Sequence, residues 1–201
     1  MRISELSRQT QISVATIKFY LREGLLPEGE HSSPTQAQYS DHHVARLRLI
    51  RALLGPGGLS IATARTVLTA IEHPPEQVHD LLGIAADAVS RPSDPGRDHT
   101  AVHSLLDRWG WQLDPKDCAS HAALADALAA IDAAGFVLPE GALDLYGRHM
   151  HDIAEIEIAN VPTDSPAAAV RYVVLGTVLV EPVLLALRRM AQQEISGRRF
   201  G

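Results

Sequence analysis

The sequence predicts an all-α protein with a helix-turn-helix near residue 1, a small two-stranded element and a second helical region. Apolar residues recur at helical spacing in most segments, as Val14, Ile17 and Leu21 do. Serine or aspartate precedes many of these segments, where a side-chain oxygen can cap a helix. Glycine or proline follows them, and stretches with β-strand character are scarce. These signals together favour short helices joined by well-marked turns.

The first two helices are predicted from capping and spacing. Residues 3–9 form a short apolar-faced segment, and residues 10–12 form the turn. Ser13 caps a second helix that ends at Gly24, and Pro27 turns the chain away. These proportions match a helix-turn-helix, with a plain helical hairpin as the alternative on this pattern alone.

Two more helices follow a polar stretch. Residues 28–40 read as a loop or small hairpin, in which residues 35–39 can alternate as a strand. Ser40 or Asp41 caps a third helix that ends at the glycine-rich turn 55–58. Ser60 caps a fourth helix through Ile71, and a pair of prolines then ends it.

The C-terminal half is predicted to be helical as well. The expected segments are a helix at 76–90, a linker at 91–97, and helices at 98–109, 114–135, 139–160 and 166–196, the last with a break or kink at Pro182. The run 170–179 is too continuously apolar for a surface helix. It forms either the centre of a core or a subunit interface.

Charge is distributed unevenly along the chain. Residues 1–73 carry eight Lys and Arg against six Asp and Glu, a net of +2, whereas residues 74–201 carry ten against eighteen, a net of −8. The sum of +2 and −8 is the net charge of −6. This asymmetry fits a DNA-facing N-terminal region joined to an acidic partner domain, although +2 permits DNA binding without identifying it.

Several other classes of protein are disfavoured. Cys118 is the only cysteine, which excludes an intrachain disulfide and a thiolate-based metal site. Residues 1–12 lack the features of a signal peptide. The most apolar run, residues 172–180, is shorter than the ~20 residues that a membrane span needs. We therefore expect a cytoplasmic protein with no membrane partner.

Four segments together carry a family resemblance. MRISELSRQTQISVATIKFYLREGLLP, a polar loop ending in Gln38-Tyr39-Ser40, HHVARLRLIRAL and GGLSIATARTVL occur in this order. The arrangement, over residues 1–71, is similar to the winged-helix DNA-binding domain of the MerR family of bacterial transcription regulators. The resemblance implies a second helix in the major groove and a wing along the neighbouring DNA backbone. It also implies a regulator that bends and untwists promoter DNA, with RNA polymerase as a further partner.

The resemblance places DNA contacts on the second helix, the wing and the third helix. Thr16 and Tyr20 have hydroxyls suited to phosphate oxygens, and Lys18 supplies a point charge. Family members often carry arginine where Ala15 and Lys18 stand, and another where Gln38 stands beside the wing tyrosine; Ala15 can touch only a thymine methyl. The expected DNA-binding residues are Ser13, Ala15, Thr16, Lys18, Phe19, Tyr20, His31, Gln36, Gln38, Tyr39 and Arg46.

The expected domains are residues 1–73 for DNA binding, 74–97 for a short connecting or dimerisation helix and linker, and 98–201 for effector binding and dimerisation. The segment 76–90 is short for a dimer helix, so we expect the C-terminal helices to contribute. Large rings could line a pocket for an apolar or aromatic effector, with simple core packing as the alternative. These rings are Trp109, Trp111, Phe136, Tyr146 and Tyr172.

No enzyme, metal or cofactor is expected. No phosphate loop, nucleophile motif or HExxH occurs. His149 and His151 are two residues apart, so on one helix they point in different directions and chelate poorly. The sequence therefore predicts a homodimeric transcription regulator acting on near-palindromic promoter DNA. The alternatives are an architectural DNA-binding protein without an effector, and a protein-interaction module whose winged helix no longer reads DNA.

Overall fold

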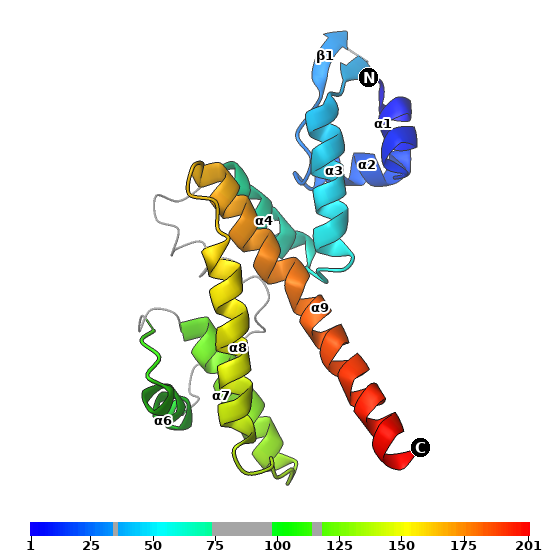
Figure 1. The fold of residues 1–201 in the computed structure, drawn as a ribbon. Helices are drawn as coiled ribbons and strands as arrows, with labels where there is room; N and C mark the ends of the chain where they lie inside the picture. The colour runs from blue at the N-terminus through cyan, green and yellow to red at the C-terminus, as the bar shows by residue number, and fades with distance from the viewer. Residues whose placement is uncertain (34–35, 74–97, 114–117) are drawn as a thin grey trace. The chain divides into compact units, whose positions relative to one another are not determined.

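The computed structural model describes residues 1–33, 36–73, 98–113 and 118–201 (Figure 1). The chain divides into two compact units. The first comprises Met1–His73 together with Val178–Gly201, and the second comprises Pro74–Thr177. The expected boundaries at 73/74 and 97/98 stay predictions, and the structure groups the end of the chain with the N-terminal unit.

The first unit begins with the expected helix-turn-helix. Helix α1 spans Ile3–Thr10 and α2 spans Val14–Arg22. Gln11 adopts a left-handed backbone conformation (φ 57°) that ends α1. The Ser7 hydroxyl donates a hydrogen bond to the Ile12 carbonyl at 2.6 Å, which fixes the turn between the two helices.

A two-stranded wing follows. Strand β1 (Glu30–Ser33) pairs antiparallel with β2 (Gln36–Gln38), and the register is irregular between residues 31 and 33. The backbone of Tyr39 is bonded to Met1 in both directions, at 2.8 and 2.6 Å, so the base of the wing is tied to the start of α1. At Gly29 a Cβ would lie 2.6 Å from the Gln38 carbonyl oxygen, so only glycine fits there.

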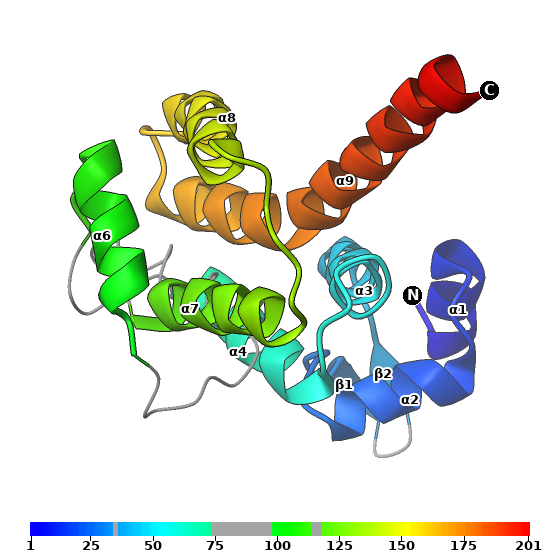
Figure 2. The ribbon, with the colours of Figure 1, turned by 90° about the horizontal axis from the view of Figure 1, so that it is seen from below.

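Helices α3 (Asp41–Leu54) and α4 (Ile61–Glu72) complete the core of this unit. Figure 2 shows α1 and α2 beside α3. Apolar side chains from all four helices are fully buried, among them Leu6, Ile17, Leu47, Ile50, Val67 and Leu68. The turn at 55–58 packs on the last helix of the chain, because a Cβ at Gly57 would lie 2.8 Å from a methyl carbon of Val178.

The second unit is helical throughout its described residues. It contains α6 (Thr100–Trp109), α7 (Cys118–Ala133), α8 (Ala142–Ala159) and the first part of α9 (Pro166–Phe200). Val102, Leu106 and Ala125 form a buried cluster, against which Trp109, Trp111, Leu124 and Leu128 pack. The expected helix at 76–90, the linker at 91–97 and the cap at 114–115 lie outside the described residues.

Helix α9 is not broken at Pro182. It runs without interruption from residue 166 to residue 200, with Pro182 inside it, so of the expected break or kink the break is wrong. Proline removes one intrahelical hydrogen bond, which thirty-four other helical residues outweigh. The segment Ala168–Phe200 is therefore long and apolar enough to cross a membrane by length and composition, contrary to our estimate from residues 172–180. A core helix of a soluble protein can pass the same test.

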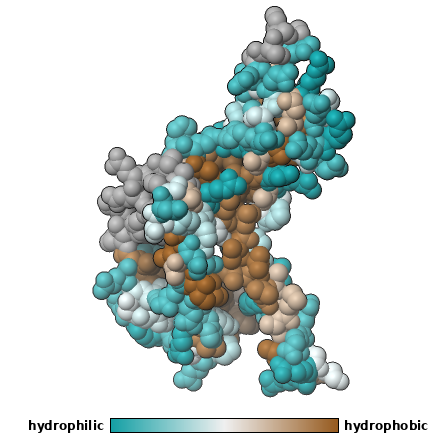
Figure 3. All heavy atoms as spheres, turned by 45° about the horizontal axis from the view of Figure 1, so that its top comes forward, coloured by the Kyte–Doolittle hydropathy of each residue, from teal (hydrophilic) through white to brown (hydrophobic). Residues whose placement is uncertain are grey.

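The two ends of α9 differ in burial. Val170, Val173, Val174 and Val178 are buried, which places one face of the apolar run 170–179 in the interior. Beyond residue 184 every side chain is exposed. Figure 3 shows hydrophobic residues (brown) at the surface along α9, interspersed with hydrophilic ones toward its end. The expected fold class, an all-α protein with a winged helix-turn-helix and a further helical region, is confirmed.

Candidate DNA-binding surface

One face of α2 is exposed and carries two positive charges. Ala15, Lys18 and Arg22 follow one another at i+3 and i+4 spacing, and all three are exposed. Ile17, on the opposite face, is fully buried. The buried face fixes the rotation of the helix, so Lys18 and Arg22 point away from the protein together.

The first turn of α2 is capped by its own hydroxyls. The Ser13 Oγ accepts a hydrogen bond from the Thr16 amide at 3.1 Å, and the two side-chain oxygens lie 2.8 Å apart. The exposed N-terminus of a helix carries partial positive charge and spare N–H donors. Ser13 and Thr16 therefore border a site that favours an anion such as a phosphate.

Phe19 and Tyr20 lie beside the exposed face and are half-buried. Their ring centroids are 5.9 Å apart with the rings tilted. The Tyr20 carbonyl accepts hydrogen bonds from the amides of Leu25 and Leu26, at 2.9 and 3.2 Å, and thereby closes the turn after α2. The Arg65 guanidinium donates to the Glu23 carbonyl at 2.8 Å and pairs with its carboxylate at 3.3 Å. These contacts hold the end of α2 against α4.

Of the wing residues expected to contact DNA, two are exposed and one is buried. Gln36 and Gln38 are exposed on β2, and His31 lies on β1 opposite Ala37. Tyr39 is only 7% exposed, and its ring meets the His43 ring edge-on at 5.2 Å. Burial, and secondarily the negative charge of Glu28, raises the pKa of the Tyr39 phenol. Tyr39 is therefore a core residue at the base of the wing, and the expected DNA contact is corrected.

Arg46 is a second correction. Its side chain is 7% exposed and points into the protein. The Nε donates to the Leu25 carbonyl at 2.8 Å, and Nη1 lies 2.8 Å from a carboxylate oxygen of Glu72 and 3.5 Å from the Leu68 carbonyl. Burial lowers its pKa, which the charge of Glu72 partly offsets. Arg46 joins α3 to the turn after α2 and to α4, so it cannot reach a phosphate.

Arg22 is the residue that sequence reasoning missed. It follows Lys18 by four positions, so a helical projection places both on one face. Arg22 is absent from the DNA-binding residues expected from the sequence, which placed the end of the second helix at Gly24. The exposed cations within α1 and α2 are Arg8, Lys18 and Arg22, and Arg2 is exposed at the N-cap of α1.

The second unit brings together two of the five expected aromatic residues. The Trp109 and Trp111 rings lie 5.0 Å apart, and His151 lies 5.6 Å from Trp111. A cavity of about 320 Å³ is lined by Trp109, Gly110, Trp111, Arg148, His151 and Asp152. Phe136, Tyr146 and Tyr172 are exposed, and within the described ranges no ring contact joins them to the tryptophans.

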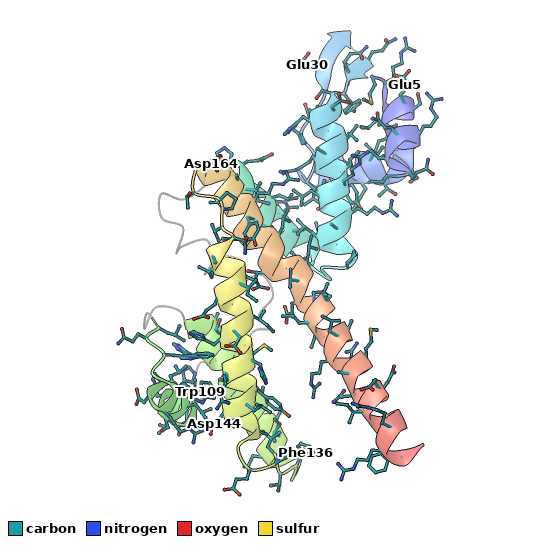
Figure 4. All side chains as sticks on the ribbon, viewed as in Figure 1. Glu5, Glu30, Trp109, Phe136, Asp144 and Asp164 are labelled. Carbon is teal, nitrogen blue, oxygen red and sulfur yellow. The ribbon has the colours of Figure 1, made fainter. Side chains whose placement is uncertain are left out.

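Asp144 links α6 to α8 (Figure 4). Its Oδ1 accepts a hydrogen bond from Trp109 Nε1 at 2.7 Å and lies 2.7 Å from the Arg108 guanidinium. The Trp109 hydrogen bond first, and the Arg108 charge next, lower the pKa of this carboxyl. Gly147 makes the approach possible, because a Cβ there would lie 3.0 Å from the Trp109 ring.

The two histidines of α8 form separate surface pairs. His149 lies 3.6 Å from Asp152 and His151 lies 3.7 Å from Glu155. Within residues 1–33, 36–73, 98–113 and 118–201, no group of three His, Cys, Asp or Glu side chains could hold a metal ion.

Comparisons with known proteins identify the family of the chain. Residues 1–71 match the family described as MerR HTH family regulatory protein. The crystal structure of the putative transcriptional regulator SCO5550 from Streptomyces coelicolor A3(2) superposes with a TM-score of 0.67. The two chains are 32% identical, and the match covers 100% of this chain and 98% of that one. No curated protein matches the chain. The chain therefore belongs to the MerR family of DNA-binding transcription regulators and is not an enzyme.

Proposed function

We propose that the protein is a homodimeric regulator that reads two half-sites of a near-palindromic promoter. The exposed Ala15–Lys18–Arg22 face of α2, held by the buried Ile17, is the observation that carries this proposal. A helix in the major groove needs one projecting face and a rigid support behind it. As a DNA-binding regulator the protein acts in the cytoplasm, where bacterial promoters and RNA polymerase are found.

The chemistry of α2 divides its contacts into two kinds. Lys18 and Arg22 neutralise phosphates, and the capped N-terminus at Ser13 receives another phosphate oxygen. Ala15 has no hydrogen-bonding side chain, so it contributes shape and contact with a thymine methyl. Arg22 also has the bidentate donor pattern that suits guanine. The exposed glutamines of β2 follow the adjacent backbone.

Dimerisation is supported by the exposed end of α9. Val183, Leu187 and Met190 follow one another at i+4 and i+3 spacing, and each is more than half exposed. An isolated helix of this length gains little stability from hydrogen bonds alone, so a packing partner is expected. A second copy of α9 carries the same row of exposed apolar residues and can pack against it. Two-fold symmetry of the protein then mirrors the symmetry of the operator.

The second unit is the proposed site of an effector. Its paired tryptophans and the cavities beside α6 provide apolar surface with a few polar groups, as small-molecule sites do. Bending promoter DNA costs several kcal/mol, which contacts at two half-sites repay. An effector changes transcription if it binds the DNA-bending state of the regulator and its non-bending state with different affinities.

The test is a footprint of the full-length dimer on the DNA upstream of its own coding region at fixed, near-physiological salt. We expect a protected near-palindrome. Lys18→Ala and Arg22→Ala should each reduce the slope of log K against log salt by about 0.9, because each removes one phosphate contact. Arg171→Ala removes an equally exposed arginine from α9 and should leave the slope unchanged.

Two results would redirect the proposal. A folded dimer that binds no DNA at low salt would indicate a protein-interaction module. Protection that no small molecule changes, together with no ligand-induced thermal stabilisation, would indicate an architectural DNA-binding protein.

A further inference from the structure

A cavity of about 730 Å³ opens between α6, α7 and α8. Its apolar lining consists of Ala101, Leu105, Ala125, Leu128, Ala129 and Leu143. This volume lies within the range of about 300–1,000 Å³ that is typical of sites for small organic molecules. The lining helices belong to one unit, so the cavity is formed by elements that fold together.

The lining of the cavity contains more carboxylates than cations. Asp98, Asp132 and Arg108 all contribute to the lining. The Arg108 guanidinium lies 2.7 Å from Asp144, a carboxylate outside the lining, so its charge is already compensated. In the described part of the chain, no ion pair joins Asp98 or Asp132 to a cation. Two carboxylates therefore line the cavity without an ion pair among the described residues.

Asp98 is held in its charged form. Its Oδ1 accepts hydrogen bonds from the Thr100 hydroxyl at 2.6 Å and from the Thr100 amide at 2.9 Å. These bonds lower the pKa of the Asp98 carboxyl. The Ser104 hydroxyl donates to the Thr100 carbonyl at 2.9 Å, so it is already occupied. The polar chemistry that the cavity offers a ligand is therefore that of a hydrogen-bond and charge acceptor.

We propose that this cavity binds an organic cation with an apolar or aromatic body. The body fills the leucine- and alanine-lined space, and the cationic group faces Asp98 and Asp132. An anion of the same size would meet two carboxylates, and the one cation of the lining, Arg108, is already paired with Asp144. The inference rests on the proposed effector function and assigns its ligand class.

The fluorescence of Trp109 can report on the cavity. Arg108 lines the cavity, and its partner Asp144 also accepts the Trp109 indole hydrogen bond at 2.7 Å. Figure 4 labels both residues, Trp109 on α6 and Asp144 on α8. A ligand beside Arg108 changes the surroundings of this indole, so filling the cavity should change tryptophan fluorescence.

The test uses two aromatic dyes of opposite charge on the full-length protein. Acridine orange is a planar cation and 1-anilinonaphthalene-8-sulfonate is an anion. Fluorescence anisotropy should show one acridine orange per chain, with a dissociation constant at least tenfold below that of the anionic dye. Replacing both carboxylates, Asp98→Asn with Asp132→Asn, should raise the dissociation constant for acridine orange about 2- to 30-fold, as expected for two exposed ion pairs.

A matched pair of variants locates the dye. Ala129→Trp fills the cavity from α7 and should abolish binding, whereas Ala130→Trp adds the same ring at the exposed neighbouring position, outside the lining. Circular dichroism checks that both variants fold. If Ala129→Trp does not fold, the double asparagine variant still tests the inference, because its substitutions lie at exposed positions.

Three results would overturn the inference: equal affinity for the two dyes, unchanged binding in a folded Ala129→Trp protein, or unchanged affinity in the double asparagine variant. The footprint is measured in parallel on the wild-type protein. Loss of dye binding with an intact footprint refutes the ligand class alone. Dye binding as described without any footprint refutes the DNA-binding proposal and leaves the cavity assignment standing.

Discussion

Substituting Arg46 tests whether this arginine stabilises the fold or contacts DNA. Arg46→Met keeps most of the side-chain volume and removes the guanidinium. The Leu25 carbonyl then loses its 2.8 Å donor inside the protein, which costs about 1–3 kcal/mol. Glu72 is 37% exposed and remains hydrated, so loss of its ion pair adds at most about 1 kcal/mol. Removing the buried charge also removes its desolvation cost, which offsets part of this loss.

We therefore expect the free energy of unfolding to fall by about 1–3 kcal/mol. With a urea dependence of about 2 kcal/mol per molar, the unfolding midpoint should fall by about 0.5–1.5 M. Urea unfolding followed by circular dichroism measures it. Arg48→Met, two residues further along α3 and exposed, is the control and should change stability by less than about 0.5 kcal/mol.

DNA binding provides the second half of the test. Arg46→Met should leave the slope of log K against log salt unchanged, because the guanidinium touches no phosphate. A slope reduced by about 0.9 with normal stability would refute the reasoning and return Arg46 to the DNA surface.

Three further substitutions or conditions test other contacts. Ser13→Ala removes the cap of α2 and should lower stability by about 0.5–2 kcal/mol in urea; no change would mean that the cap is unimportant. Gly147→Ala should destabilise the protein by about 1 kcal/mol or more, since its Cβ meets the Trp109 ring at 3.0 Å, whereas Gly176→Ala in open space should stabilise it by up to about 1 kcal/mol. Thermal melts compare the two, and equal effects would contradict the packing. Asp144 has a lowered pKa, so its contribution to stability should be complete above about pH 4 and lost as the pH falls further. Asp144→Asn should remove this acid-dependent step from tryptophan-detected unfolding, and its persistence would assign the step to another group.

Local signals predicted the helix-turn-helix well because they act within a few residues. The cap at Ser13 and the left-handed Gly24 (φ 68°) mark both ends of α2 without any tertiary information. Arg46 shows the limit of this reasoning. Its acceptors lie 21 and 22 residues away in sequence, so a helical projection alone could not show that it points inward. Pro182 is similar, because helical context on both sides overrides the local preference for a break.

The candidate sites divide in the same way. Arg22 could have been found from the sequence, since i+4 spacing from Lys18 places it on the exposed face. The cavity between α6, α7 and α8 could not, because alanine and leucine line it and these residues carry no local signature of a site. Aromatic content predicted a pocket lined by five rings, of which Trp109 and Trp111 lie together whereas Phe136 lies exposed.

The contact between the 55–58 turn and Val178 has a consequence for synthesis on the ribosome. The N-terminal unit is discontinuous in sequence, since Val178–Gly201 belongs to it. Residues 1–73 emerge first, yet the surface around Gly57 stays uncovered until more than a hundred further residues have been translated. Nascent chains therefore expose this apolar patch for several seconds at about 5–20 residues per second, long enough for a chaperone to bind it.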